Sequence, residues 1–329
     1  MVMAQCLFAA LQRAHGSAPI DVLAPDWVRP LAARMPQIRT AIAMPMGHGE
    51  FAFLARRRLG RALRGRYSHA FVLPGSWKSA LVPYFAGIEH RVGYLREWRW
   101  GLLNDIRELP AEMNAKTARA FQALAEPAVI EDAARLIEPK LDVDPQNQGR
   151  LLAAHGLAAG RFAVLAPGAE YGPAKRWPAQ HWAALATALS ARGLTSVLLG
   201  SVKDRQPLGA ELLLHPAMRD LMGATSLGDA IDLIAASRFA VTNDSGLMHI
   251  AAAAGAPLIA LYGSTSPEHT PPLSSRARVI SLGLACSPCR ARDCPLGHLD
   301  CLVQLAPAGV LAEAEAMGLL PPDQGKARP

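Results

Sequence analysis

The sequence has no uninterrupted apolar run of about 20 residues, which is the length that a membrane-spanning helix needs. Residues 1–18 are apolar but carry no positively charged leading region, which argues against a secretory signal peptide. Internal repeats and low-complexity segments are also missing. Apolar residues make up 51% of the chain and charged residues 19%, so we expect a well-buried globular protein in the cytoplasm.

Aromatic residues are scarce (6%), and none interleaves with the most basic stretch, RRRLGRALRGR (residues 56–66). A platform for single-stranded nucleic acid needs such aromatic residues, so nucleic acid is not an expected partner. Over the whole chain, 34 basic residues against 27 acidic ones give a net charge of +7. The basic stretch is either a solvated helix face or a surface that attracts anionic substrates or the inner leaflet of a membrane.

Short β-type runs alternate with amphipathic helical stretches, which predicts an α/β protein with parallel sheets. In the first half we expect helices near 1–14 and 77–86 and strands near 20–25, 41–45, 69–74 and 91–94. Residues 110–150 lose strand character and are interpreted as a linker region that contains one helix. The second half begins again with a strand in RFAVLAPG (161–168) and a helix opened by a Ser226 cap. We therefore expect two domains, 1–150 and 151–329.

The first domain opens unusually. A doubly wound domain ordinarily begins with a strand whose loop leads into the first helix. Here the chain starts within the expected first helix, and IDVLAP (20–25) is interpreted as the second strand. An opening strand and its loop are therefore expected to be missing from this sequence.

The stretch VTNDSGLMHIAAA (241–253) joins an expected buried strand to an alanine-rich helix. A helix that begins beyond the carboxyl end of a parallel strand offers unpaired N–H groups and its positive dipole end to a phosphate. We expect Ser245 to cap this helix through its hydroxyl and Gly246 to let a ligand approach the backbone. Asp244 would accept hydrogen bonds from sugar hydroxyls, and His249 would donate to a phosphate or sugar oxygen. A capped structural helix with an incidental histidine is the alternative.

Basic side chains follow two further expected strands. In PGAEYGPAKRWP (167–178), a loop rich in glycine and proline presents Lys175, whose compact charge suits a diphosphate. In PGSWKSALVPYFAGIEHRVGY (74–94), Lys78 and Arg91 could face an anionic acceptor. Surface charge is the alternative for all three residues. Asp204, after another strand, is interpreted as an acid at a helix start rather than as a ribose ligand.

Four of the five cysteines lie within CSPCRARDCPLGHLDC (286–301), namely Cys286, Cys289, Cys294 and Cys301. In a cytoplasmic chain such crowding favours metal over disulfides, and a tetrahedral zinc ion accepts four thiolates. The spacing does not match a standard zinc finger. Structural zinc, redox chemistry and reduced, partly buried thiols therefore all remain open.

Four motifs in order along the chain together resemble the ADP-heptose:lipopolysaccharide heptosyltransferases of glycosyltransferase family 9, and most closely their type II members. They are SWKSALVPYFAGIEHRVGY, PGAEYGPAKRWP, VTNDSGLMHIAAA and LYGSTSPEHTPPLS. The resemblance implies a GT-B fold, in which two Rossmann-like domains face each other across a cleft. The first domain would bind the lipid A-core acceptor and the second ADP-heptose. It further implies an inverting transfer of L-glycero-D-manno-heptose to the first heptose of the lipopolysaccharide inner core.

The resemblance also implies roles for single residues. Lys175 would contact the donor diphosphate, and Ser245 and Gly246 would supply backbone amides to it, with Asp244 and His249 near the phosphate and the sugar. The transfer would require no cofactor, so a zinc ion at the cysteines would be structural. The enzyme would act in the cytoplasm, in peripheral contact with the inner-membrane surface.

The front end departs from the family pattern. Family members begin with a strand and a Trp-x-Gly-Asp loop whose aspartate is taken as the catalytic base, and this aspartate would precede Met1. We therefore assign no catalytic residue, expect a truncated gene model, and expect weak or absent transfer by the chain as written. Losing a general base typically costs about 10²–10⁴ in rate.

Two alternatives to an active transferase remain. One is an inactive nucleotide-sugar-binding relative without the catalytic aspartate. The other is a nicotinamide-dependent oxidoreductase, which is disfavoured because the sequence has no strand-linked G-x-G-x-x-G motif.

Overall fold

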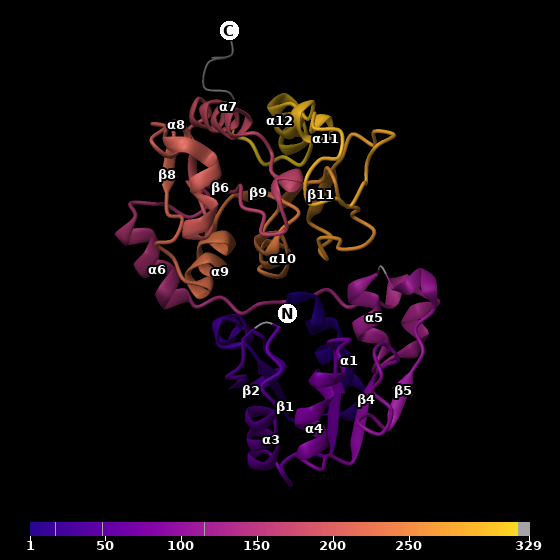
Figure 1. The fold of residues 1–329 in the computed structure, drawn as a ribbon. Helices are drawn as coiled ribbons and strands as arrows, with labels where there is room; N and C mark the ends of the chain where they lie inside the picture. Colours follow the sequence, from indigo (N-terminus) through magenta and orange to yellow (C-terminus); the bar gives the residue numbers. More distant parts are fainter. Residues whose placement is uncertain (17, 48, 115, 322–329) are drawn as a thin grey trace. The chain divides into compact units, whose positions relative to one another are not determined.

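The computed structural model describes residues 1–321 except 17, 48 and 115, and the chain divides into two compact units (Figure 1). Unit 1 comprises Met1 and Met3–Ile137, and unit 2 comprises Val2 and Glu138–Pro329. Both units consist of parallel strands with helices packed on them, as the α/β pattern predicts.

Unit 2 contains one six-stranded parallel sheet with the order β11-β10-β9-β6-β7-β8. Its strands are β6 (Phe162–Ala166), β7 (Thr195–Leu198), β8 (Met218–Asp220), β9 (Phe239–Asn243), β10 (Leu258–Leu261) and β11 (Ala277–Ile280). The first strand, β6, lies in the middle, and the order reverses there, as in a doubly wound Rossmann sheet. The sequence of β6, FAVLA, is apolar throughout because both of its faces are covered, and every residue in it is 0% exposed.

The helices of unit 2 surround this sheet. They are α6 (Pro145–Ala154), α7 (Ala179–Ser190), α8 (Gly209–Leu213), α9 (Leu227–Ala236), α10 (Gly246–Ala253), α11 (Asp300–Val303) and α12 (Pro307–Ala316). Trp182 and Leu185 of α7 and Val310 of α12 belong to the main core cluster, and α7 packs on α12. Ser226 caps α9 in a reciprocal pair with Asp229, which confirms the predicted cap.

The division between the units lies at Ile137 and Glu138, whereas the sequence placed it at residue 150. The structure assigns α6 to unit 2 because this helix is tied to the fully buried Asp232 of α9. The Asp144 N–H and the Asn147 side-chain amide donate to the two carboxylate oxygens of Asp232 at 2.9 and 2.7 Å. The Pro, Asn and Gln residues that suggested a linker therefore begin a helix and make a buried polar contact.

Unit 1 contains two smaller parallel sheets. The first pairs β1 (Ile20–Ala24) with β2 (Ile38–Ala43), and the second has the order β3-β4-β5, formed by His69–Val72, His90–Tyr94 and Asp105–Arg107. Its helices are α1 (Gln5–His15), α2 (Arg29–Ala32), α3 (Phe53–Ala62), α4 (Leu81–Phe85) and α5 (Thr117–Ala123). The expected strands are present, and β5 is an additional one. In the described part of the chain β1 and β3 are not paired with each other, so the sheet is divided where a doubly wound unit has its first strand.

Candidate functional site

The carboxyl edge of the unit 2 sheet brings three loops together. β6, β9 and β10 are neighbouring parallel strands, so the segments that follow them leave the sheet at the same edge. These segments are 167–175, 244–245 and 262–270. Each contains part of one of the four motifs on which the family resemblance depends.

Lys175 and Asp244 form the centre of this edge. The Lys175 Nζ lies 2.6 Å from the Asp244 Oδ2, and the two side chains are only 14% and 5% exposed. Thr265 donates its hydroxyl to the same oxygen at 2.7 Å, and Thr270 donates to Oδ1 at 3.4 Å. The Lys175 ammonium also lies 5.1 Å from the centre of the Tyr171 ring. A lysine and an acid that are 69 positions apart thus meet in one nearly buried cluster.

The neighbouring Asn243 explains how this cluster is held. It is fully buried at the end of β9, and its amide nitrogen donates to the Pro167 carbonyl at 2.7 Å. Its amide oxygen accepts from the Trp177 N–H at 3.3 Å. Asn243 therefore fastens both ends of the loop that carries Lys175 to the strand that carries Asp244. Asn243, Thr265 and Thr270 were not predicted, although Asn243 ends β9, Thr265 and Thr270 lie in the loop after β10, and all three lie within the motifs.

Helix α10 begins at Gly246, directly beside this cluster, as the sequence predicts. The prediction that Ser245 caps it through the side chain is wrong. Ser245 occupies the N-cap position, but its hydroxyl makes no capping bond and is buried without a partner among the described residues. The Ser264 hydroxyl of the next loop is in the same state. Apart from its chain neighbours and the backbone of its own helix, no atom of the described residues lies within 4 Å of the place where a Cβ on Gly246 would be, so the backbone there faces open space.

His249 lies on the first turns of α10 and is partly buried. Burial lowers its pKa from the ordinary value of 6.5 to about 4, and the negative charge of Asp244 only partly opposes this effect. The imidazole is therefore neutral at physiological pH. It still carries one N–H and can donate one hydrogen bond, and its donation to a phosphate or sugar oxygen stays a prediction.

Lys78 belongs to unit 1, where it lies in a short 3₁₀ helix, Trp77–Ala80. Its ammonium donates to the Gly49 carbonyl at 2.7 Å. Arg56 of α3 is buried and donates to the carbonyls of Phe51, Glu50 and Lys78, so one arginine of the basic stretch is structural rather than solvated. Arg91 likewise donates to the carbonyls of Leu102 and Ile88.

Asp204 forms a reciprocal cap with Ser201 at the start of a 3₁₀ helix, Val202–Asp204. The interpretation as an acid at a helix start is thus the one that the structure supports.

The four clustered cysteines are free thiols, with Cys286 and Cys289 exposed and Cys301 buried. Four backbone N–H groups, of Leu299 first and then Leu296, Gly297 and His298, point at the Cys294 sulfur and lower its pKa. Burial raises the pKa of Cys301, and the other three thiols add to this effect. Within residues 1–321, leaving aside 17, 48 and 115, no three His, Cys, Asp or Glu side chains are placed to hold a metal ion.

Among the described residues, no helix is both long and apolar enough to cross a bilayer.

Comparison with known proteins decides the family. A sequence profile of Glycosyltransferase family 9 (heptosyltransferase) matches residues 56–300. Lipopolysaccharide heptosyltransferase 2 of Escherichia coli K12 is 45% identical over 330 residues, which cover 96% of this chain and 94% of the relative. The chain belongs to glycosyltransferase family 9.

Two further relatives agree with this membership. Lipooligosaccharide heptosyltransferase 2 of Haemophilus influenzae is 46% identical and covers 86% of this chain and 85% of its own. The solved structure of E. coli ADP-heptose lps heptosyltransferase II superposes with a TM-score of 0.81 at 42% identity, covering 96% of this chain and 94% of that one. The predicted GT-B fold class and the predicted glycosyltransferase activity of this family 9 chain are thereby confirmed.

The lowered pKa of His249 predicts a pH dependence of stability. Because the folded pKa of about 4 lies below the ordinary 6.5, the stabilisation is complete above pH 6.5 and is lost as the pH falls toward 4. We expect the loss to reach at most about 3 kcal/mol in the free energy of unfolding. Urea unfolding of the protein and of His249→Gln between pH 4.5 and 7.5 measures the difference. The control variant His155→Gln, which removes another histidine of unit 2, should retain the full pH dependence of stability. If the free energy of unfolding of His249→Gln varied with pH just as that of the unchanged protein does, the lowered pKa of His249 would be contradicted.

Proposed function

We propose that this family 9 glycosyltransferase moves a heptose from ADP-heptose to the lipopolysaccharide core, with the first inner-core heptose as acceptor. The observation that carries the proposal is the cluster of Lys175, Asp244 and Thr265 beside the start of α10. The identity of 45% with a lipopolysaccharide heptosyltransferase 2 over nearly the whole chain supports the choice of substrates.

The donor diphosphate would bind at the carboxyl edge of the unit 2 sheet. Lys175 supplies a positive charge there, and the first N–H groups of α10 and its dipole supply partial positive charge. Gly246 leaves room for the diphosphate against the backbone. The partnerless hydroxyls of Ser245 and Ser264 are further donors, since buried polar groups rarely remain without a hydrogen bond.

Asp244 has two tasks in this proposal. Without the donor it balances the charge of Lys175, which would otherwise be nearly buried without a partner. With the donor bound, the diphosphate shares Lys175, and the Asp244 carboxylate, still held by Thr265, accepts a sugar hydroxyl. The neutral His249 adds one N–H donor without adding a second full charge.

The transfer itself exchanges one bond at the anomeric carbon. The acceptor hydroxyl oxygen forms a bond to that carbon while the bond to the ADP oxygen breaks, so attack from the opposite face inverts the configuration, and the hydroxyl proton is released to water. The electron pair of the broken bond passes to the diphosphate, where negative charge grows. Lys175 and the α10 amides would face this charge, and groups that are oriented in advance stabilise a transition state with little reorganisation.

Lys175→Ala should reduce both ADP affinity and heptosyl transfer. Removing one preorganised donor to a developing charge typically costs about 10²–10³ in rate. Calorimetric titration with ADP and transfer from ADP-heptose to a heptose-bearing core acceptor are the two measurements. Lys203→Ala, which removes an exposed lysine of the same unit, is the matched control and should change neither. Unchanged ADP affinity in a folded Lys175→Ala protein would exclude Lys175 from the donor site.

Unit 1 would bind the lipid-linked acceptor, with Lys78 near its anionic groups, at the cytoplasmic face of the inner membrane. The support is an exposed apolar patch formed by Phe51, Phe53, Leu54 and Trp77. The Phe51 ring lies 5.8 Å from that of Phe53 and 5.1 Å from that of Trp77. Exposed Arg58, Arg61 and Arg64 follow along and just beyond α3. Apolar side chains beside arginines suit an anionic bilayer surface, where each basic residue contributes about 1 kcal/mol.

The membrane contact predicts binding to anionic vesicles. The protein should sediment with phosphatidylcholine vesicles that contain about 30% phosphatidylglycerol, an anionic content of physiological order. The double variant Arg58→Glu/Arg61→Glu should bind these vesicles at least about tenfold more weakly. Arg150→Glu/Arg219→Glu changes the net charge equally but on exposed positions of unit 2, and should bind nearly as the unchanged protein does. Equal losses in both double variants would show that only total charge matters and would remove the patch.

The four cysteines of 286–301 would hold a structural zinc ion in this proposal. The support is the crowding of four cysteines within residues 286–301 and the four backbone N–H groups that lower the pKa of the Cys294 thiol. The ion would fix the loop and take no part in transfer. Elemental analysis should find about one zinc per chain, lost together with some thermal stability in Cys289→Ser/Cys294→Ser. Zinc far below one per chain in protein purified without chelators would refute the site.

A further inference from the structure

A segment of the cysteine-containing stretch, 287–292, packs on the loops that form the candidate site of unit 2. We call this segment the strap. Its Ser287 hydroxyl donates to the Gly263 carbonyl at 2.5 Å, and its Arg290 N–H donates to the Ser264 carbonyl at 2.7 Å. Both acceptors lie in the loop that follows β10, so the strap is fixed to one of the three loops of the site.

The strap also contacts the loop that carries Lys175. The Arg292 carbonyl accepts from the Ala174 N–H at 3.1 Å. Gly172 lies so close that a Cβ there would be 2.4 Å from the Arg292 carbonyl oxygen and 2.5 Å from the Arg292 Cγ. The backbone of Gly172 is extended, with a φ of 163°, so glycine is needed here for the close approach and not for the backbone conformation. The strap therefore joins the loop of Lys175 to the loop that follows β10.

Tyr171 connects the strap to the Lys175 ammonium. Its hydroxyl donates to the Arg290 carbonyl at 2.9 Å, and the centre of its ring lies 5.1 Å from the Lys175 Nζ. The ring is thus held between the strap and the ammonium. Because the ammonium also bonds to Asp244, its position is fixed from two directions.

Arg290 holds this connection through its backbone. Its φ of 57° lies in the left-handed region, which residues with a side chain rarely adopt. In this conformation its N–H bonds to one loop of the site and its carbonyl to another. The guanidinium is exposed and donates to the His269 Nε2 at 2.9 Å, so neither backbone contact uses it. Such strain persists where the surrounding structure requires it, which is most often at functional sites.

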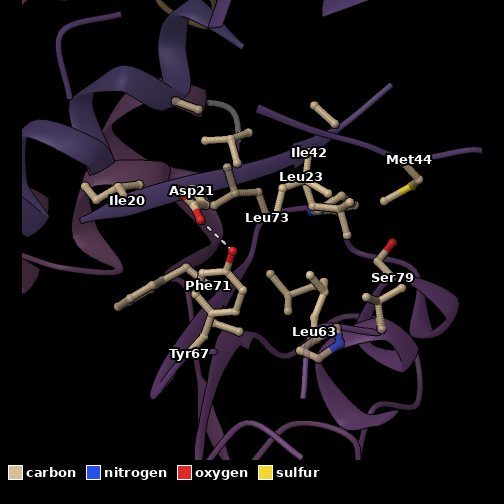
Figure 2. A pocket seen from close by; sticks show the side chains of 18 of the residues that line it. Ile20, Asp21, Leu23, Ile42, Met44, Leu63, Tyr67, Phe71, Leu73 and Ser79 are labelled. Atoms are coloured by element: carbon tan, nitrogen blue, oxygen red, sulfur yellow. Dashed lines mark hydrogen bonds between the residues drawn. The ribbon is translucent and has the colours of Figure 1, made fainter. Parts of the chain in front are cut away.

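The Tyr67 hydroxyl of unit 1 provides a contrast. It donates to the Asp21 Oδ2 at 2.5 Å, as the dashed line in Figure 2 marks, and this acceptor is a side chain that Arg39 also binds. The Tyr171 hydroxyl instead bonds to a backbone carbonyl. The direction of that carbonyl is set by the backbone conformation of Arg290, so a change in this conformation would break the contact.

We propose that the strap and Tyr171 position the Lys175 ammonium for the donor diphosphate, and that this positioning depends on the left-handed backbone of Arg290. Tyr171 and Arg290 act through Lys175 and are positioning residues. A lysine side chain is long and flexible, so holding its ammonium in place reduces the entropy that is lost when the diphosphate binds. The inference rests on the proposed function, because it takes Lys175 to bind the donor.

The first test compares two variants that both remove the Arg290 side chain. Arg290→Gly accepts a positive φ without cost, whereas the β-branched side chain of Arg290→Val strongly disfavours it. Calorimetric titration measures ADP affinity, and Tm reports whether each variant is folded. We expect Arg290→Gly to bind ADP at least about tenfold more tightly than Arg290→Val, since the left-handed conformation is that much less accessible to a residue with a Cβ. Equal ADP affinity in the two variants, whether lowered or not, would overturn the proposal.

Tyr171→Phe provides a second measurement in case Arg290→Val does not fold. It keeps the ring and removes only the hydroxyl, so we expect about threefold weaker ADP binding and a similar loss in kcat/KM for ADP-heptose. In the Lys175→Ala background the same change should have little further effect on kcat/KM, because the two residues act through one ammonium. A full threefold loss in that background would show that Tyr171 acts independently of Lys175 and would contradict the positioning role.

The outcomes separate this inference from the proposed function. If the unchanged protein binds ADP and Lys175→Ala weakens that binding, but Arg290→Val and Tyr171→Phe bind ADP as the unchanged protein does, only the positioning role is overturned. If the unchanged protein does not bind ADP, the proposed function fails and the positioning role fails with it.

Discussion

The contact between Lys175 and Asp244 is the interaction on which the candidate site of unit 2 depends. It places a cation, nearly buried and already compensated, at the edge where three loops leave a parallel sheet. Because this cation is already largely desolvated, a diphosphate could bind it without a further desolvation cost for the ammonium group. The hydroxyls of Thr265 and Thr270 also donate to this carboxylate and hold it in place.

Charge balance links this contact to the rest of the site. The start of α10 contributes partial positive charge, and His249 is kept neutral by burial rather than adding a second cation. An anion that enters therefore meets one full charge and several oriented dipoles. In the proposed function, this arrangement would stabilise the charge that grows on a departing diphosphate more than the charge present before transfer, and such a difference lowers a barrier.

The sequence was sufficient for features that depend on periodicity and on strand ends. The α/β class, the helix beginning at Gly246 and the shared edge of Lys175 and Asp244 all follow from apolar runs that stop at polar residues.

Features that depend on a partner far along the chain were not predictable. Asn147 was assigned to a linker because nothing local reveals its bond to Asp232, 85 positions away. Ser245 was expected to cap α10 because its residue type favours capping, yet its hydroxyl does not bond to the helix. Arg56 was grouped with solvated arginines, although three carbonyls hold it inside unit 1.

The position of bound ADP tests the central claim most directly. In a crystal structure of the complex, the account predicts diphosphate oxygens within about 3 Å of the Lys175 Nζ and of backbone nitrogens at the start of α10. The Asp244 carboxylate should then be turned toward the sugar side and still accept from Thr265. A diphosphate bound away from Lys175 and Gly246 would contradict the account.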